Sequence, residues 1–530
     1  MSRNLTHFCL LILISLLPGM AESADNVKIL RRGNGVEPES LDPHRARAVE
    51  TLNIMRDLYE GLTRHAVDGS IVPGVAQSWN LSDNGKRYTF TMRDEARWSN
   101  GEPVTAGDFV FALRRAINPT TASPYAKVLD IIENAKSILA GEAKPESLGV
   151  RVSESGQLII RLDSPAAHLL QVLALPIAFP VHENTMARVG SRFARPEHSV
   201  TNGAYQLEAW QVHGYIRLKK NPHYWNHDEV PIDTVLYYPV ADENAELSRF
   251  RAGELDLTFT LPARRVAWAR DNLAQALHLT PYLGTYFYGF NLTRPPFKDQ
   301  PGLRRALSLV IDRKVLTEKV LNTGDVPAWS WVPPGISGYQ SARLEYADWD
   351  LTKKLAEAQK LYTAAGYSPD NPLQLELRFN TGDNHRRIAL AIAAMWRQKL
   401  GIETTLINEE WKVFIQNRRQ QQITQVYRSS WIGDYNDPWT FAEVMHSKHG
   451  INDFGYNNND YNNLLRIAAM QTDSAERNRI LQRAEAKMLN DHPVIPLFFY
   501  VSKHLVSPRV GGWVDNPLDV HLSQYLYLKD

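Results

Sequence analysis

Apolar residues in the second half of the chain alternate between a helical spacing and a two-residue spacing. Leu351–Ala365 has the helical spacing and is followed by Gly366, a residue type that commonly ends helices. The next segment, 373–379, places an apolar side chain at every second position, as a half-buried strand does. A helix capped at Asn384 follows, and 402–406 again has the spacing of a strand. This alternation predicts an α/β unit built around a sheet.

The rest of the chain contains the same two spacings. Tyr88–Met92 alternates as a strand does, and Thr105 is placed to cap the helix that follows. Further along, Pro301 opens a segment whose apolar side chains keep the helical spacing as far as Leu321, so we expect one helix there. A helix that ends before Gly61 has an apolar face consisting of Leu52, Met55, Leu58 and Tyr59.

The N-terminus has the pattern of a secretory signal peptide. Arg3 lies in a short charged leader, Phe8–Leu17 is apolar except for one serine, and Ala21 and Ala24 offer small residues for cleavage. The apolar run is shorter than the roughly 20 residues that a membrane span needs. We therefore expect residues 1–24 to be removed on secretion.

Composition narrows the class of protein further. The single cysteine, Cys9, lies within the leader and has no lipidation motif before it, so we expect neither a lipid anchor nor disulfides. The 530 residues exceed the roughly 250–300 that one core supports, which predicts several lobes. Lys and Arg (59) balance Asp and Glu (58), so the chain has no net field that would attract nucleic acid. The aromatic residues, 13 Trp, 22 Tyr and 17 Phe, suit the walls of binding pockets.

The stretch Trp431–Phe441 carries the most informative chemistry. It places the carboxylate of Asp434 among aromatic residues and beside an Asn-Asp-Pro turn. A carboxylate in such apolar surroundings needs a cationic partner. That partner is either another side chain of this protein or a ligand.

Motifs along nearly the whole mature chain resemble the family 5 extracellular solute-binding proteins. The longest match runs from Ala76 to Phe109, with Asn-Gly at two turns where Asp-Gly is usual, a mild change because Asn accepts the same turn conformations. The stretch Trp431–Pro438 is similar to the segment by which periplasmic oligopeptide-binding proteins of ABC importers hold the α-ammonium of a peptide. Further segments resemble family motifs and occur in the same order as in the family, namely Thr121–Tyr125, Thr201–Tyr205, Asn221–Trp225, Arg251–Asp256, Asn408–Lys412 and Val510–Gly512.

This resemblance implies an α/β fold of the periplasmic-binding-protein type II (cluster C), with three lobes and mixed sheets around a hinged ligand cleft. We expect lobe I to combine 25–59, 184–284 and 501–530. Lobe II is expected at 60–183 and lobe III at 285–500. A chain that crosses between lobes twice makes a two-strand hinge, which can close around a ligand.

The resemblance also implies a set of ligand-binding residues. Asp434 matches the position that holds the ammonium, while Arg428, Arg418 and His385 match cations that hold the carboxylate of peptides of different lengths. An arginine fork fits a carboxylate through two hydrogen bonds. The remaining expected contacts are Trp411, Tyr125, Val49, Trp431, Tyr435 and Phe259.

Two positions, one of them among these contacts, differ from the family pattern. Arg47 stands where oligopeptide-binding proteins often carry an acidic residue, and Phe259 stands where a tyrosine is common. An added positive charge and a lost hydroxyl at the pocket rim change which peptides we expect the protein to prefer, toward acidic side chains.

An enzyme is not expected from this sequence. It has no His-Glu-x-x-His zinc motif, no Gly-x-Ser-x-Gly nucleophile elbow and no phosphate loop. His446 and His449 near Glu443 could be written as a metal cluster, but such spacing is common by chance and fits a polar surface. We therefore expect no catalytic residue, no metal and no cofactor.

We expect a periplasmic, monomeric protein of a Gram-negative cell that binds oligopeptides and delivers them to inner-membrane ABC permease subunits with cytoplasmic ATPases. The main alternative keeps the fold and changes the ligand, because fold does not fix function. Relatives with this fold bind murein peptides, dipeptides, bile acids, haem or nickel complexes. A structural or chaperone-like role is the third possibility, and it would require exposed apolar patches.

Overall fold

The computed structural model describes residues 27–46, 48–449 and 451–529. The predicted signal peptide, Cys9 and Arg47 lie outside the described residues. Within the described part, no helix is long and apolar enough to cross a membrane.

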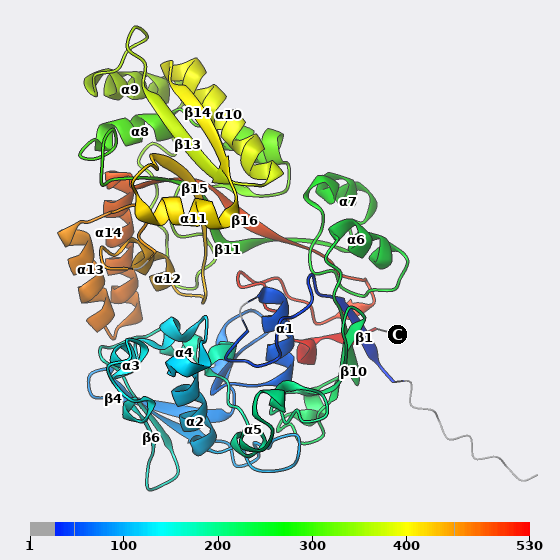
Figure 1. Cartoon of the computed structure of the whole chain (residues 1–530). Helices are drawn as coiled ribbons and strands as arrows, with labels where there is room; N and C mark the ends of the chain where they lie inside the picture. The colour runs from blue at the N-terminus through cyan, green and yellow to red at the C-terminus, as the bar shows by residue number, and fades with distance from the viewer. Residues whose placement is uncertain (1–26, 47, 450, 530) are drawn as a thin grey trace, which may run out of the picture.

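Two four-stranded sheets form the lower half of the molecule in Figure 1. The first has the order β1 (Ile29–Gly33), β10 (Thr234–Tyr238), β9 (Tyr215–Lys220) and β8 (Tyr205–Gln211). The second has the order β4 (Ala76–Ser82), β5 (Arg87–Met92), β7 (Leu158–Arg161) and β6 (Val150–Val152). The helices of this half are α1 (Val49–Leu58), α2 (Ala106–Ile117), α3 (Ala135–Leu139), α4 (Leu169–Val172) and α5 (Glu183–Val189). Helices α6 (Glu243–Arg251) and α7 (Val266–Asn272) lie higher in Figure 1 and share a small separate core with Leu505. Short strands β2 (Thr63–His65) and β3 (Ile71–Pro73) pair with each other.

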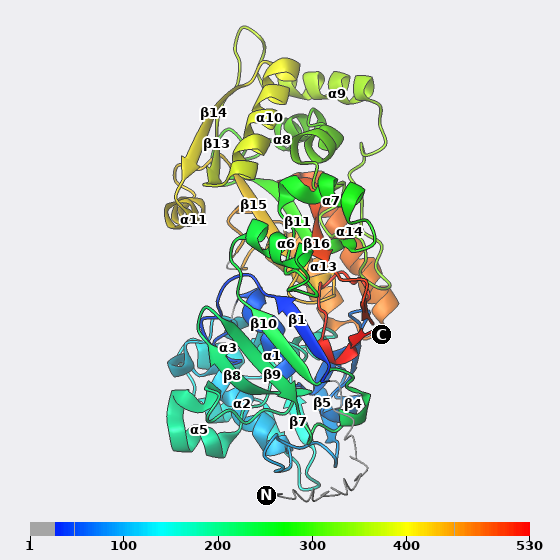
Figure 2. The ribbon, with the colours of Figure 1, turned by 90° about the vertical axis from the view of Figure 1, so that its right-hand side faces the viewer.

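A six-stranded mixed sheet forms the upper half. Its order is β12 (Val326–Pro327), β16 (Val494–Leu505), β11 (Leu277–Phe290), β15 (Val426–Ile432), β13 (Gln374–Asn380) and β14 (Glu403–Glu409). Its helices are α8 (Pro301–Leu309), α9 (Leu351–Ala364), α10 (Asp383–Leu400), α11 (Trp411–Gln420), α12 (Trp439–Ala442), α13 (Asn459–Met470) and α14 (Ser474–Asp491). The C-terminal strands β17 (Val510–Gly511) and β18 (Tyr527–Leu528) return to the lower half, as the red segments of Figure 2 show.

Several predicted elements are present for the expected physical reasons. Thr105 precedes α2, and its backbone N–H donates to the Asp108 carboxylate at 2.7 Å, which closes a capping box. The predicted helix 351–365 is α9, and Asp350 caps it by accepting from the N–H of Lys353 at 2.8 Å. The parallel pairing of β13 with β14 on either side of α10 confirms the predicted strand-helix-strand unit.

The helix predicted to be capped at Asn384 has its N-cap two residues earlier. The backbone N–H of Thr381 donates to the carbonyl oxygen of Glu409 at 3.0 Å, so the pairing of β13 with β14 continues as far as Thr381. The chain then turns at Gly382, which occupies the N-cap position of α10. Asn384 therefore lies inside the first turn and does not cap the helix.

The long helix predicted after Pro301 is wrong in its second half. It ends at Leu309 and resumes as a π-helical turn over Val315–Leu321. Between the two segments the buried guanidinium of Arg313 donates to the carbonyl oxygens of Ser308 and Ile311 at 3.3 and 3.4 Å. The Ser308 carbonyl also accepts from the N–H of Ile311 at 3.4 Å, so Arg313 caps carbonyl groups at the end of α8 and just beyond it. The apolar spacing gave no sign of this ending.

The apolar cores do not follow the predicted lobes one to one. One large cluster draws buried residues from both lower sheets, so the predicted lobes I and II share a core. A second large cluster lies between Leu283 and Phe498 and fills the upper half. Most of each half therefore has its own interior, while Tyr435 and Trp439 of the upper half also pack against the lower cluster.

Strands β11 and β16 run side by side from one half to the other (Figures 1 and 2). Leu277 pairs with Leu505 at the lower end and Gly289 pairs with Val494 at the upper end. The pairing register shifts between Pro281 and Thr285, so the ladder is interrupted in its middle. This interruption coincides with the point at which we expected the chain to cross between lobes.

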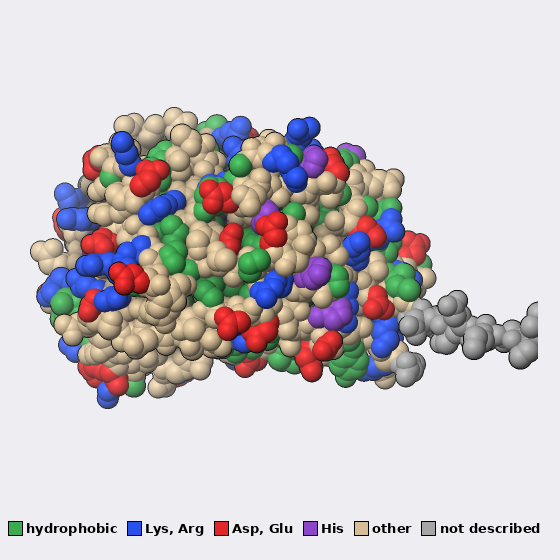
Figure 3. All heavy atoms as spheres, turned by 90° about the horizontal axis from the view of Figure 1, so that it is seen from below, with side chains coloured by type: hydrophobic (Ala, Val, Ile, Leu, Met, Phe, Trp, Pro, Cys, Tyr) green, Lys and Arg blue, Asp and Glu red, His purple; other side chains and the backbone are tan. Residues whose placement is uncertain are grey.

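The surface seen from below carries charges of both signs. Lys and Arg side chains are interspersed with Asp and Glu side chains across this face (Figure 3). This distribution agrees with the formal net charge of +1.

Candidate ligand cleft

A cavity of about 300 Å³ lies where the two halves of the molecule meet. We call it the Asp434 cavity. Its walls come from α1, from the segment 175–177 of the second predicted lobe, from the end of β15 and from the C-terminal segment. The polar and aromatic side chains that line it include Asn53, Arg56, Tyr125, Tyr282, Trp431, Asp434 and Asp519.

Local hydrogen bonds position Asp434 at the end of β15. The N–H of Gly433 donates to the carbonyl oxygen of Leu283 on β11 at 2.8 Å, which extends the sheet pairing by one residue. The N–H of Asp434 donates to the hydroxyl of Thr440 at 3.4 Å. These contacts use the backbone of Asp434 and leave its carboxylate facing the cavity.

The two aspartates of this motif have opposite environments. Asp437 is paired internally, because both terminal nitrogens of Arg477 donate to its carboxylate at 2.8 and 2.9 Å. Asp434 forms no ion pair with any residue that the structure describes. Burial raises the pKa of the Asp434 carboxyl to about 6, since water is excluded and no cation compensates the charge. The carboxylate therefore lacks, within the described chain, the partner that its surroundings require.

Arg56 is a cation in the same cavity that the sequence prediction missed. No described residue forms an ion pair with it, and its buried Nε has no hydrogen-bond partner there. Burial lowers the pKa of this guanidinium to about 10, and the groups that partly offset the effect are tyrosines, chiefly Tyr282 and Tyr125. A signal was present in the sequence, because Arg56 occupies the helical spacing of the apolar face, four residues after Leu52.

A second cavity of about 320 Å³ borders the first, and Trp431 lines both. We call it the Arg428 cavity. It lies along β15 and α11. Four of the residues predicted from the family resemblance line it, namely Trp411, Arg418, Arg428 and Trp431.

The Arg428 guanidinium has no carboxylate partner among the described residues. It donates to the Asn380 side-chain oxygen at 3.2 Å and to the hydroxyls of Ser430 and Tyr500 at 3.4 Å each. The guanidinium carbon of Arg428 lies 4.9 Å from the centre of the Tyr286 ring, and Nε has no hydrogen-bond partner among the residues that the structure describes. These neutral contacts hold the side chain and leave its positive charge uncompensated.

His385 contacts Tyr286, the same residue whose ring lies next to the Arg428 guanidinium. The Tyr286 hydroxyl is 3.1 Å from His385 Nδ1. Burial, and then the charge of Arg428, lower the pKa of His385 to about 4. His385 is therefore neutral at pH 7, and it can offer a carboxylate a hydrogen bond without an added charge.

Arg418 is already paired within the protein. Its Nε donates to the Asp453 carboxylate at 2.6 Å, and its NH1 donates to Ser429 at 3.0 Å. Arg418 lines the same cavity as Arg428, but its charge is already compensated by Asp453. Arg418 is therefore the less available of the two.

The remaining predicted residues divide into two groups. Val49 and Tyr125 line the Asp434 cavity, and Trp411 on α11 is 52% exposed at the Arg428 cavity. Tyr435 and Phe259 line neither cavity. The Tyr435 hydroxyl donates to Glu443 at 3.2 Å and its ring stacks on His168, while the N–H of Phe259 donates to Glu246 at 2.7 Å.

The chain is similar to known proteins along most of its length. The chain matches the model of the bacterial extracellular solute-binding proteins, family 5 Middle, over residues 70–453. It is 37% identical over 503 residues to the periplasmic oligopeptide-binding protein OppA of Escherichia coli (strain K12), which covers 94% of this chain and 92% of OppA. It is also 37% identical over 495 residues to the periplasmic murein peptide-binding protein MppA of the same organism, with 93% and 91% covered.

The solved structure of MppA in its unliganded open form superposes with a TM-score of 0.86 at 36% identity, covering 95% of this chain and 98% of MppA. This likeness confirms the predicted type II periplasmic-binding-protein fold. The family model spans more than half of the chain, and the relatives span nearly all of it. The chain therefore belongs to family 5 of the bacterial extracellular solute-binding proteins.

Proposed function

We propose that this protein binds short peptides in the cleft formed by the Asp434 and Arg428 cavities. The observation that carries the proposal is the pair of uncompensated charges on one segment, the carboxylate of Asp434 and the guanidinium of Arg428. A free peptide carries an ammonium at one end and a carboxylate at the other, whatever its sequence. Each end would supply the charge that the protein group lacks.

The separation of the two groups suits a short extended peptide. Six residues separate Arg428 from Asp434, so about 3.3 Å per residue gives at most roughly 20 Å between their Cα atoms. A peptide of three to five residues at about 3.3–3.6 Å per residue is roughly 10–18 Å long. The two side chains take up part of the span. Backbone pairing along the cleft would add sequence-independent affinity, as in strand addition.

His385 and Arg418 would have lesser parts in this scheme. His385 is neutral, so it would donate a hydrogen bond to the carboxylate of a peptide that extends past Arg428. Arg418 would have to share its charge with Asp453. Trp411, Trp431, Tyr125 and Val49 would cover side chains with flat or apolar surfaces that do not select one sequence.

Closure around the peptide would use the three predicted lobes, 25–59 with 184–284 and 501–530, 60–183, and 285–500. The interrupted register of β11 and β16 is the natural hinge, because a missing section of ladder bends more easily than a paired one. Tyr282 lies in this interruption and also lines the Asp434 cavity. Bending there would therefore change the shape of the cavity directly.

We further propose that the protein is a monomeric receptor without enzymatic activity, secreted into the periplasm and not anchored by lipid. It would deliver its peptide to inner-membrane ABC permease subunits that are driven by cytoplasmic ATPases. The similarity to OppA, a periplasmic oligopeptide-binding protein, supports the proposed location and ligand.

A second ligand class is favoured by one observation. Arg56 places an uncompensated cation in the Asp434 cavity, close to where the first residues of a peptide would lie. A peptide with an acidic side chain near its ammonium would satisfy both charges. Acidic peptides, including murein peptides such as those bound by the MppA relative, are therefore the narrower candidate.

Calorimetric titration of the refolded, ligand-stripped mature protein tests the proposal. The series should contain neutral peptides of two to six residues, the same peptides with an acidic second residue, and deoxycholate as a non-peptide ligand. We expect saturable heat for the peptides, strongest at three to five residues. Absence of heat with every peptide, together with heat for deoxycholate, would overturn it.

A further inference from the structure

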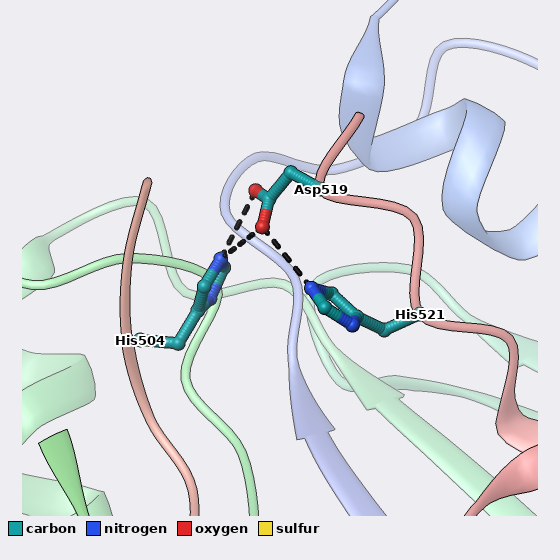
Figure 4. Close-up of side chains that lie close together, drawn as sticks. All are labelled: His504, Asp519 and His521. Atoms are coloured by element: carbon teal, nitrogen blue, oxygen red, sulfur yellow. Dashed lines mark hydrogen bonds and ion pairs between the residues drawn. The ribbon is translucent and has the colours of Figure 1, made fainter. Parts of the chain in front are cut away.

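Three side chains near the C-terminus converge (Figure 4), and one of them, Asp519, lines the Asp434 cavity. His504 belongs to β16, and Asp519 and His521 belong to the segment before β18. The Nε2 of His504 lies 2.8 and 3.0 Å from the two Asp519 carboxylate oxygens, and the Nε2 of His521 lies 3.1 Å from one of them. One donor atom from each residue lies within 4.8 Å of the others.

Surrounding groups hold both imidazoles in these orientations. The Nδ1 of His504 lies 3.0 Å from the carbonyl oxygen of Thr258, so Nδ1 carries a proton and Nε2 is the atom directed at Asp519. The Trp513 ring stacks on His521 at 3.6 Å between ring centres, with 17° between the planes. A carbonyl that fixes the far nitrogen of a histidine is the support that metal-binding histidines commonly have.

We propose that His504, Asp519 and His521 form a binding site for a divalent cation of the Zn²⁺ type. Two imidazole nitrogens and one carboxylate oxygen are a donor set that Zn²⁺ prefers. Bonds of about 2.0–2.1 Å in a tetrahedral site separate neighbouring ligand atoms by roughly 3.3 Å. The nitrogen-to-oxygen distances of 2.8–3.1 Å are already close to that value, so the main adjustment is to bring the two nitrogens together.

The site joins two parts of the chain that meet beside the proposed hinge. His504 lies on a strand that connects the two halves, while Asp519 and its neighbours Leu518 and Val520 line the Asp434 cavity. A bound ion would fix this cavity wall to β16. Three protein ligands also leave one coordination position for water. The site differs from the sequence expectation, which included no metal and considered only His446 and His449 near Glu443.

Zinc titration of the mature protein after treatment with a chelator tests this site without any peptide, so its outcome is independent of the proposed function. We expect binding of one Zn²⁺ per chain by calorimetry, a rise in melting temperature with Zn²⁺, and visible absorption bands with Co²⁺. A tenfold excess of Mg²⁺ should not compete, because Mg²⁺ prefers oxygen ligands in octahedral geometry.

Variants decide where the ion binds. Asp519→Asn and His521→Gln should each weaken Zn²⁺ binding by at least about 100-fold, with circular dichroism confirming that they fold. The double variant His446→Gln/His449→Gln removes the same residue type at the other histidine cluster and should bind Zn²⁺ as the wild type does. Absence of one-to-one binding in the wild type would overturn the proposal. So would unchanged binding in both site variants, and the three residues would then be a hydrogen-bonded group only.

Discussion

Replacing Asp434 by asparagine should stabilise the ligand-free protein. The pKa of the Asp434 carboxyl rises from 3.8 to about 6 because the group is buried without a described cation. A carboxyl whose folded pKa is raised binds its proton more tightly in the folded state, so ionising it costs stability as pH rises from about 4 to about 6. Roughly two pKa units at about 1.4 kcal/mol each correspond to a loss of about 3 kcal/mol in the free energy of unfolding. This loss is fully present above pH 6.

Urea unfolding of the peptide-free protein, followed by tryptophan fluorescence, measures this effect. The free energy of unfolding of Asp434→Asn should exceed that of the wild type by up to about 3 kcal/mol at pH 7.5. This difference should shrink toward zero near pH 4. Asp437→Asn, three residues away, is the matched control. It leaves Arg477 without its buried partner and should lose about 3–5 kcal/mol at pH 7.5. A loss of stability in Asp434→Asn, or a gain independent of pH, would refute the reasoning.

Three further predictions concern ligand binding and closure. Peptide affinity should fall by up to about tenfold per pH unit below pH 6, because Asp434 becomes protonated in the free protein. Calorimetry at pH 5 and pH 7.5 measures this fall, and equal affinities at the two pH values would contradict the prediction. Arg428→Ala should remove the preference for a free over an amidated C-terminus, by about 10–100-fold in titrations, whereas a preference that survives would place the carboxylate elsewhere. Gly284→Val should hinder closure measured by small-angle scattering with peptide, because an added Cβ lies 2.4 Å from Ile432 Cδ1 and 3.0 Å from Tyr500 Cδ2.

The parts of the fold that depend on local pattern could be predicted from the sequence. The strand-helix-strand unit from β13 to β14 has clear apolar periods and appears as expected. The break after Leu309 could not be foreseen, because it depends on where the Arg313 guanidinium finds carbonyl acceptors in the folded chain. The core shared by the two lower sheets likewise depends on packing between segments far apart in sequence.

The candidate site was predictable where one short motif carries the chemistry. The motif marked Asp434 as a carboxylate in need of a cation, and the structure adds that Asp437 is the internally paired one. Sequence alone could not tell that Arg418 is neutralised by Asp453, since 35 residues separate them. The sequence does not identify Arg56 as a cation of the Asp434 cavity, because one charged residue on an apolar helix face does not show what its side chain packs against in the fold.

The central claim is that Asp434 holds the ammonium of a peptide, and titration with free and N-acetylated forms of one tetrapeptide tests it most directly. The wild type should lose about a hundredfold to several thousandfold in affinity on acetylation, which corresponds to about 3–5 kcal/mol for an unpaired buried charge. Asp434→Asn should bind both forms weakly and equally. A wild type that binds the acetylated peptide as tightly as the free one would contradict the account.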